Sequence, residues 1–178
     1  ERHTPVAVTG LTGVVAISAG GGHNLALKSD GTVWAWGRNG WGELGKGIFS
    51  DHAATPVQVI GLTGITTISA SYHNLALKSN GTVWAWGYNS SGQLGDGTTS
   101  NRSTPVPVNG LTGVVALSAG GYHSLARVAT TRSVSGTVLL EDIVPSALAQ
   151  LLTFDFRPTD GSPTFTRQTS VSPNGGFQ

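Results

Sequence analysis

The sequence predicts an all-β protein assembled from repeated units, and two observations carry this prediction. The first is self-similarity, because His23, His73 and His123 follow one another at a constant interval, and Trp36 and Trp86 repeat that interval. The second is composition, because 26 of the 178 residues are glycine. Glycine-rich turns between short apolar and β-branched runs are typical of small antiparallel sheets. We therefore expect strands joined by tight turns, repeated along the chain.

Each complete unit divides into three predicted strands. In the first unit these are residues 14–18, 23–28 and 33–37, which are short runs rich in apolar residues. A turn at residues 29–32 joins the last two, and the second unit places Asn80-Gly81 at the equivalent point. Asn-Gly is a strong hairpin signal, so a hairpin is predicted in each unit.

The alternation along this hairpin indicates a sheet that is covered on both faces. Leu25 and Leu27 point to one side of their strand and Ala26 to the other. Trp34 and Trp36 share one side of the next strand. We interpret this as a bulky face and a small face on each sheet, with one nesting on the other. Sheets stacked radially as the blades of a propeller have this arrangement, and the repeat supplies the neighbours.

Longer motifs carry a family resemblance. The first unit reads Ser-Ala-Gly-Gly-Gly-His-Asn-Leu-Ala-Leu at 18–27, Gly-Thr-Val-Trp-Ala-Trp-Gly-Arg-Asn at 31–39 and Gly-Glu-Leu-Gly at 42–45. The second unit matches it at 73–77, 81–89 and 92–95. Both closely resemble the RCC1 repeat, which implies a β-propeller over residues 1 to about 128. The amino-acid sequence of the repeats resembles that of bacterial surface or secreted members of this family. The resemblance implies an extracellular or cell-surface location.

The domain organisation follows from where the repeat ends. The sequence predicts a partial RCC1-like β-propeller of about two and a half blades, in units 1–50, 51–101 and a truncated 102–128. Arg127 replaces the leucine of the other units, and Val134 and Gly136 replace the two tryptophans. The chain starts and stops inside patterns, so we expect it to be a piece of a longer protein whose upstream part completes the last blade.

Residues 129–178 differ in composition and are predicted to begin a second β-rich domain. Strands are expected at 136–141, 152–156 and 164–171, with a turn at 158–163. This tail resembles the opening half of an immunoglobulin-like or carboxypeptidase-regulatory-like β-sandwich. It is too short for a whole sandwich, so an incomplete β-sandwich-like segment is predicted.

Composition argues against several classes of site. The chain has no cysteine, which excludes disulfides, thiolate catalysis and cysteine-based zinc sites. The net charge of +1, without a run of Lys or Arg, argues against nucleic-acid binding. No apolar run is long enough to span a bilayer. No catalytic triad, carboxylate pair or phosphate loop stands out, so we predict neither an enzyme nor a cofactor.

Three features leave alternatives open. The repeated histidines could converge on a metal, but no carboxylate recurs beside them, so a hydrogen bond within the start of each blade is favoured. The oxygen-rich loop at 95–101 resembles a calcium loop, yet Lys46 replaces Asp96 in the first unit, which favours a polar connection. The repeated tryptophans could form a chromophore or a sugar platform, and a core role is favoured.

Candidate binding residues are large side chains that differ between the units. Residues that are identical in every unit are explained by the fold that the units share. That explanation does not apply to the large residues that differ, which are Arg38, Trp41, Ile48, Phe49 and Tyr88. Their counterparts in the other unit are tyrosine, serine, two threonines and arginine, respectively. All follow the Trp-Gly that ends the hairpin, so we hypothesise a contact surface on one rim. In the alternative, Ile48 and Phe49 fill a gap against the next blade.

These observations predict a non-catalytic scaffold that binds an unknown protein or surface ligand, as part of a larger bacterial secreted or surface protein. The RCC1 namesake exchanges nucleotide on a small GTPase, so a nucleotide-exchange regulator is the alternative function. A secreted enzyme inhibitor of the β-lactamase-binding kind is another. Open blade faces also favour self-association.

Overall fold

The computed structural model describes residues 3–129, 151–156 and 165–170. The chain divides into two compact units, Glu1–Thr131 and Arg132–Gln178. Every regular element in the described ranges is a strand, which confirms the all-β prediction. None of these ranges contains a helix long and apolar enough to cross a membrane.

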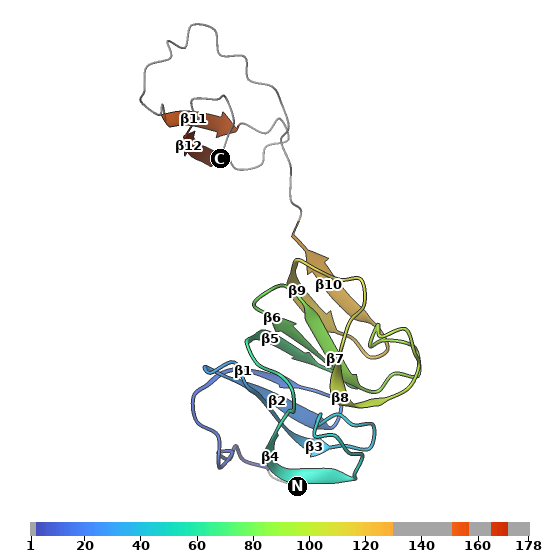
Figure 1. Ribbon diagram of the computed structural model, residues 1–178. Coiled ribbons are helices and arrows are strands. Elements are labelled where there is room, and N and C mark those ends of the chain that lie inside the picture. The colour runs from blue at the N-terminus through green and yellow to red at the C-terminus, as the bar shows by residue number, and fades with distance from the viewer. Residues whose placement is uncertain (1–2, 130–150, 157–164, 171–178) are drawn as a thin grey trace, which may run out of the picture. The chain divides into compact units, whose positions relative to one another are not determined.

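The compact unit Glu1–Thr131 is a row of three antiparallel sheets, which we call blades 1, 2 and 3 (Figure 1). Each complete blade has four strands in sequential order, and blade 3 has two in the described part. The arrangement confirms a partial propeller. Blade 1 contains β1 (Val14–Ala19), β2 (His23–Lys28), β3 (Val33–Arg38) and β4 (His52–Gln58); blade 2 contains β5 (Ile65–Ala70), β6 (His73–Lys78), β7 (Val83–Gly87) and β8 (Arg102–Pro107); blade 3 contains β9 (Val114–Ala119) and β10 (Ser124–Val128).

The outer strands β4 and β8 are not predicted by the sequence. β4 contains Pro56, and β8 contains Pro105 and Pro107; proline cannot donate to a β-ladder and therefore weakens a strand assignment. Both strands lie at a sheet edge, where proline is tolerated. Because β4 starts after position 50, the sheet of blade 1 extends into the second sequence unit. Blade and sequence unit are out of phase because a periodic pattern does not show where a blade begins.

The inner hairpins turn at Asp30-Gly31 and Asn80-Gly81, as predicted. Gly31 has a φ of 77°, a left-handed conformation that glycine adopts without steric cost. The Asp30 carboxylate accepts hydrogen bonds from the backbone N–H of Thr32 at 3.0 Å and from its hydroxyl at 2.6 Å. A side chain at Gly31 would also meet the backbone of Gly64 at 3.1 Å, so the turn lies tightly against blade 2.

The prediction of one bulky and one small face on each sheet is wrong. Directly paired residues lie on the same face of an antiparallel sheet. Leu25 pairs with Ala35 and Ala26 pairs with Trp34, so each face combines large and small side chains. The sequence shows the alternation within one strand, but the register between strands decides which residues share a face.

Two hydrophobic cores hold the blades together. The first lies between blades 1 and 2, where Leu25 and Ala35 pack with Ala76 and Trp86. The second lies between blades 2 and 3, where Leu75 and Ala85 of blade 2 pack with Val114 of blade 3. Blade 2 therefore buries both of its faces against its neighbours, as expected of the interior of a repeat array.

The compact unit Arg132–Gln178 contains β11 (Leu151–Phe156) and β12 (Phe165–Ser170). They pair antiparallel, from Leu151 opposite Ser170 to Phe156 opposite Phe165. These strands lie where the sequence predicts strands at 152–156 and 164–171. The strand predicted at 136–141 and the turn at 158–163 lie outside the described residues. The β-sandwich-like identity of the tail stays a prediction.

Candidate functional site

A group of aromatic side chains gathers at one end of the blades. In each complete blade the first residue of the second strand pairs with the glycine near the end of the third, as His73 pairs with Gly87. Residues just before that histidine and just after that glycine therefore lie at the same end of the sheet. We call the resulting group the aromatic rim: Arg38, Trp41, Tyr72, Tyr88 and Tyr122.

The rim is continuous across all three blades. The Trp41 and Tyr88 ring centroids are 4.3 Å apart, and Trp41 meets Tyr72 edge-on at 5.9 Å. Tyr122 lies 5.7 Å from Tyr72 and 6.1 Å from Tyr88. These separations are typical of interacting aromatic pairs. The guanidinium carbon of Arg38 lies 3.8 Å from the centroid of Trp41, which is a cation–π contact.

A buried carboxylate holds one end of the rim in place. Glu43 is 2% exposed, and its Oε2 accepts a hydrogen bond from the backbone N–H of Trp41 at 2.8 Å. Its Oε1 lies 3.5 Å from Nε of Arg38. The same carboxylate thus fixes the backbone that carries the indole and the cation above it. In blade 2 the counterpart is Gln93, whose Oε1 accepts from the backbone N–H of Ser91 at 2.9 Å.

Buried asparagines organise the long connections that leave the rim. Oδ1 of Asn39 accepts from the backbone N–H of Leu44 at 2.9 Å. Its Nδ2 donates to the carbonyl of Ile48 at 2.9 Å and to the hydroxyl of Ser50 at 3.0 Å. Asn89 makes the equivalent bond to Leu94 at 2.9 Å in blade 2. The connection is therefore built on a buried polar centre, and Trp41 is presented on a rigid loop.

The structure brings together three of the five residues that the sequence singles out. Arg38, Trp41 and Tyr88 lie together in the rim, with Trp41 contacting both of the others. Ile48 and Phe49 lie further along the same connection and are 57% and 54% exposed. With this exposure they do not fill a gap between the described blades. No aromatic contact within the described ranges joins Phe49 to the rim.

Sequence reasoning misses Tyr72 and Tyr122. Both occupy the position before the repeated histidine, where the first unit has Gly22. The signal that marks Trp41, a large residue that differs between units, also marks these two tyrosines. The sequence prediction covers only the connection after Trp-Gly, and the antiparallel register is what places the two segments side by side.

The repeated histidines join neighbouring blades. Nε2 of His23 lies 2.6 Å from Oδ1 of Asn74, and Nε2 of His73 lies 2.7 Å from the hydroxyl of Ser124. The expected hydrogen bond within the histidine's own blade is therefore wrong for His23 and His73. Burial lowers the pKa of His23 and brings the pKa of His73 down to about 4, so both stay neutral at pH 7. The described part of the chain contains no metal-binding group of His, Asp or Glu side chains.

The oxygen-rich loop of blade 2 is closed by an ion pair. Oδ2 of Asp96 lies 2.7 Å from Nε of Arg102, and Thr98 donates to the same carboxylate from its backbone and its hydroxyl. The carboxylate is thus engaged by a guanidinium within its own blade, in agreement with a polar connection.

Blades 1 and 2 have the same strand order and contact each other through His23 and Trp86. Repeated sheets packed in this way define a propeller scaffold. Residues 30–77 and 80–127, more than half of the chain, match the family model for the Regulator of chromosome condensation (RCC1) repeat. A second model of the same repeat matches residues 14–42. The chain belongs to the RCC1 repeat family.

Curated relatives share about one repeat with this chain. It is 41% identical over 56 residues to Protein pim1 of Schizosaccharomyces pombe, covering 32% of this chain and 10% of that protein. It is 39% identical over 64 residues to the Regulator of chromosome condensation of Drosophila melanogaster, covering 36% and 11%. It is 38% identical over 72 residues to E3 ubiquitin-protein ligase HERC2 of Homo sapiens, covering 38% and 2%. The chain thus spans a small part of each.

Solved structures support the fold. Prp20p from Saccharomyces cerevisiae superposes with a TM-score of 0.58 at 24% identity, over 67% of this chain and 32% of that one. Human WBSCR16 superposes with a TM-score of 0.56 at 21% identity, over 64% and 30%. In both cases the chain matches about a third of a larger protein.

Proposed function

We propose that this propeller is a non-catalytic protein-binding module whose contact surface is the aromatic rim. The observation that carries the proposal is the unbroken row of Trp and Tyr rings across three blades. Trp, Tyr and Arg are the residues that most often dominate binding at protein interfaces. Here they stand on connections of a rigid scaffold, where binding residues are common.

The fold itself does not require these side chains. Blade 1 has Gly22 at the position of Tyr72, and blade 2 has Ser91 at the position of Trp41. Both blades still form four-stranded sheets. Tyr122 is 60% exposed, and the side chain of Arg38 is 45% exposed. A partner would cover apolar ring surface and meet phenol hydroxyls at its border. This combination suits a protein surface with an apolar centre and polar edges.

Variants of the rim test the proposal. Trp41→Ala and Tyr88→Ala are compared with the parent chain by crosslinking to partners in an extract of the source cells, with quantitative mass spectrometry. We expect specific partners to be depleted by at least about fivefold, because truncating a central aromatic residue commonly costs more than ~1 kcal/mol of binding energy. Thr99→Ala, on the exposed connection of blade 2, is the matched control and should retain them.

Phe49→Ala decides how far the surface extends. If Phe49 contributes, this variant also loses partners, and the surface follows the connection beyond the rim. Retention of every specific partner by Trp41→Ala and Tyr88→Ala, with unchanged melting temperatures, would rule out the rim as the contact surface.

A nucleotide-exchange function is the second candidate, because the chain is 39% identical to the Drosophila Regulator of chromosome condensation and 41% identical to pim1 over one repeat. Among the structural neighbours, Prp20p has binding properties toward Gsp1p and histones, and these belong to that yeast protein. Release of labelled nucleotide from a panel of small GTPases, with and without this chain, separates exchange from simple binding.

A place in a larger bacterial secreted or surface protein, with an extracellular or cell-surface location, belongs to the same proposal. It is supported by the resemblance of the repeat sequences to those of bacterial surface or secreted members of the family. Fractionation of source cells with an antibody to residues 1–128 tests it.

A further inference from the structure

Arg38 is the one charged residue of the aromatic rim, and its guanidinium is held in a defined position. The guanidinium carbon lies 3.8 Å from the centroid of Trp41, and Nε lies 3.5 Å from Oε1 of Glu43. Stacking uses the face of the planar guanidinium and leaves free the edge that carries its N–H groups. Within the described residues, neither terminal nitrogen of Arg38 forms a hydrogen bond, and the side chain is 45% exposed. These donors are therefore open to a partner.

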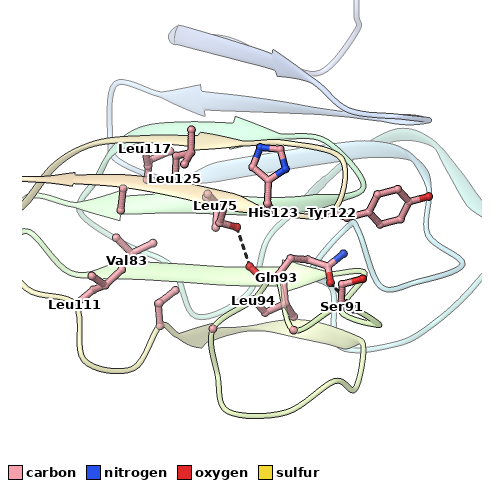
Figure 2. Close-up of a pocket in the computed structure, with 15 residues that line it drawn as sticks. Leu75, Val83, Ser91, Gln93, Leu94, Leu111, Leu117, Tyr122, His123 and Leu125 are labelled. Carbon is pink, nitrogen blue, oxygen red and sulfur yellow. Dashed lines mark hydrogen bonds between the residues drawn. The ribbon is translucent and has the colours of Figure 1, made fainter.

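The charge of Glu43 is not required by the loop that contains it. In blade 2 the neutral Gln93 makes the equivalent bond to the backbone N–H of Ser91 at 2.9 Å, and Figure 2 shows these two residues next to each other. Burying a carboxylate costs more free energy than burying an amide, unless a cation is paired with it. The negative charge at position 43 is therefore explained by its ion pair with Arg38, which fixes the cation over the indole.

Two glycines flank the side chain of Arg38. A carbon added to Gly22 would lie 3.3 Å from Cβ of Arg38, and a carbon added to Gly40 would lie 3.7 Å from its Nε. In blade 2 the counterpart of Gly40 is Ser90, whose hydroxyl donates to the phenol oxygen of Tyr88. Tyr88 is itself the counterpart of Arg38, so the polar end of this side chain is engaged within blade 2. In blade 1 no side chain at position 40 can do the same.

Arg102 of blade 2 shows how an arginine is used within a blade. Its Nε lies 2.7 Å from Oδ2 of Asp96, and a terminal nitrogen lies 3.3 Å from the hydroxyl of Thr98. This guanidinium closes its own loop and finds its acceptors there. Arg38 has a single ionic partner among the described residues, at the longer distance of 3.5 Å and on its Nε side. Its remaining donors are thus not used by the fold.

A carboxylate is the acceptor that matches these donors. Two parallel N–H groups on the edge of a guanidinium meet the two oxygens of a carboxylate, and the bonds are strengthened by charge. One guanidinium that already shares its charge with Glu43 fits a single carboxylate better than the repeated phosphates of a nucleic acid. The net charge of the whole chain, +1, agrees with this choice.

The rim has a charged end and an uncharged end. Arg38 lies in blade 1, and the tyrosines continue the rim to Tyr122 before the second strand of blade 3, which is 60% exposed. Figure 2 shows the ring of Tyr122 extending away from the leucines between blades 2 and 3. A ligand that follows the rim therefore meets a cation first and aromatic rings after it.

We propose that the partner of the rim is an acidic peptide segment, in which an Asp or Glu side chain lies at one end of an apolar run. The carboxylate accepts hydrogen bonds from the terminal nitrogens of Arg38, and the apolar side chains cover Trp41, Tyr88 and Tyr122. This inference rests on the proposed function of the rim and adds the chemical class of the partner to it.

Selection from a random peptide library displayed on phage tests the proposal on the full chain. Peptides that bind the parent chain and not its Trp41→Ala variant are ligands of the rim, whatever their sequence. We expect them to carry Asp or Glu at one end of an apolar run. A synthetic copy of such a peptide should bind Arg38→Gln at least about tenfold more weakly than the parent chain, as expected for a close charge pair across an interface.

Replacing the acidic residue of the peptide by its amide completes the test without changing the protein. The amide peptide should bind the parent chain at least about tenfold more weakly, and it should no longer distinguish the parent chain from Arg38→Gln. Arg38→Lys keeps the charge without the planar fork and should recover only part of the affinity. Lys28→Gln removes the same charge at the opposite end of β2 and should leave binding unchanged.

Two kinds of failure can be told apart. Peptides that require Trp41 but contain no acidic residue would overturn this inference and leave the proposed function in place. Equal affinity of the acidic peptide and its amide for the parent chain would do the same. Failure to select any peptide that requires Trp41 would instead contradict the proposed function, and this inference with it.

Discussion

Trp36 and Trp86 are equivalent in the sequence and different in the structure. Trp86 is fully buried between blades 1 and 2 and donates a hydrogen bond to Glu43. Trp36 has the same place in blade 1 but stays half-buried, because no described blade packs on that side. The contribution of each ring to stability therefore depends on the neighbouring blade and not on the repeat motif.

Alanine substitution should separate the two tryptophans. We expect Trp86→Ala to lower the free energy of unfolding by about 3–5 kcal/mol, through the cavity it creates and the lost hydrogen bond. Trp36→Ala should cost markedly less, because part of its ring is already in water. Urea denaturation followed by circular dichroism measures both, and equal losses would contradict the assignment of Trp86 to the core between blades.

At the scale of elements, the connection from β3 to β4 behaves as a built part of the fold. Asn39 is fully buried and forms hydrogen bonds to Leu44, Ile48 and Ser50. Asn89 repeats this pattern in blade 2. The two connections differ in the side chains they display, while the buried centre is the same.

Removing this buried centre should disturb both stability and the rim. Asn39→Ala leaves the buried N–H of Leu44 without its partner, so we expect a loss of about 1–3 kcal/mol. Because Trp41 lies on the same connection, partner capture by the rim should fall as well. Ser50→Ala removes only one of the hydrogen bonds of Asn39 and serves as the control. Its effect on unfolding should be smaller, and a similar loss in both variants would argue against a central role for Asn39.

The strands show what pattern can predict at this scale. The inner strands of each blade follow from apolar runs and from the Asp-Gly and Asn-Gly turns, and the structure places them within a residue of the prediction. The outer strands are not predicted from the sequence because Pro56 and Pro105 interrupt their patterns. They form nevertheless, because a strand at a sheet edge tolerates proline and a central strand does not.

For the whole molecule, the ends of the row of blades are the decisive feature. Ile17 and Val15 of blade 1 are 78% and 62% exposed, and Leu125 of blade 3 is 62% exposed. Exposed apolar surface of this kind marks a site of contact with another chain or another blade. Repeat arrays derive much of their stability from contacts between neighbours, so the isolated chain lacks part of its expected support.

We therefore predict that the isolated chain self-associates. Sedimentation velocity should show an average mass that rises with concentration over the micromolar range, and the melting temperature should rise with it. Ile17→Asp places a charge on the open face of blade 1 and should shift the equilibrium toward the monomer. A monomer with a sharp melting transition that does not depend on concentration would contradict the prediction.

The sequence by itself determined the repeat, the all-β class, the hairpins and the family. All of these depend on local patterns that recur along the chain. It also singled out Arg38, Trp41 and Tyr88, because large side chains that differ between units stand out against the repeat. Only the tertiary structure decided the strand register, which brings Tyr72 to the same end of the sheet as Tyr88. It also decided the packing between blades, which adds Tyr122 to the rim and joins His23 to Asn74 of the next blade. Pairing between strands and packing between blades depend on long-range contacts, and the same local motif occurs whether or not a neighbour is present to cover it.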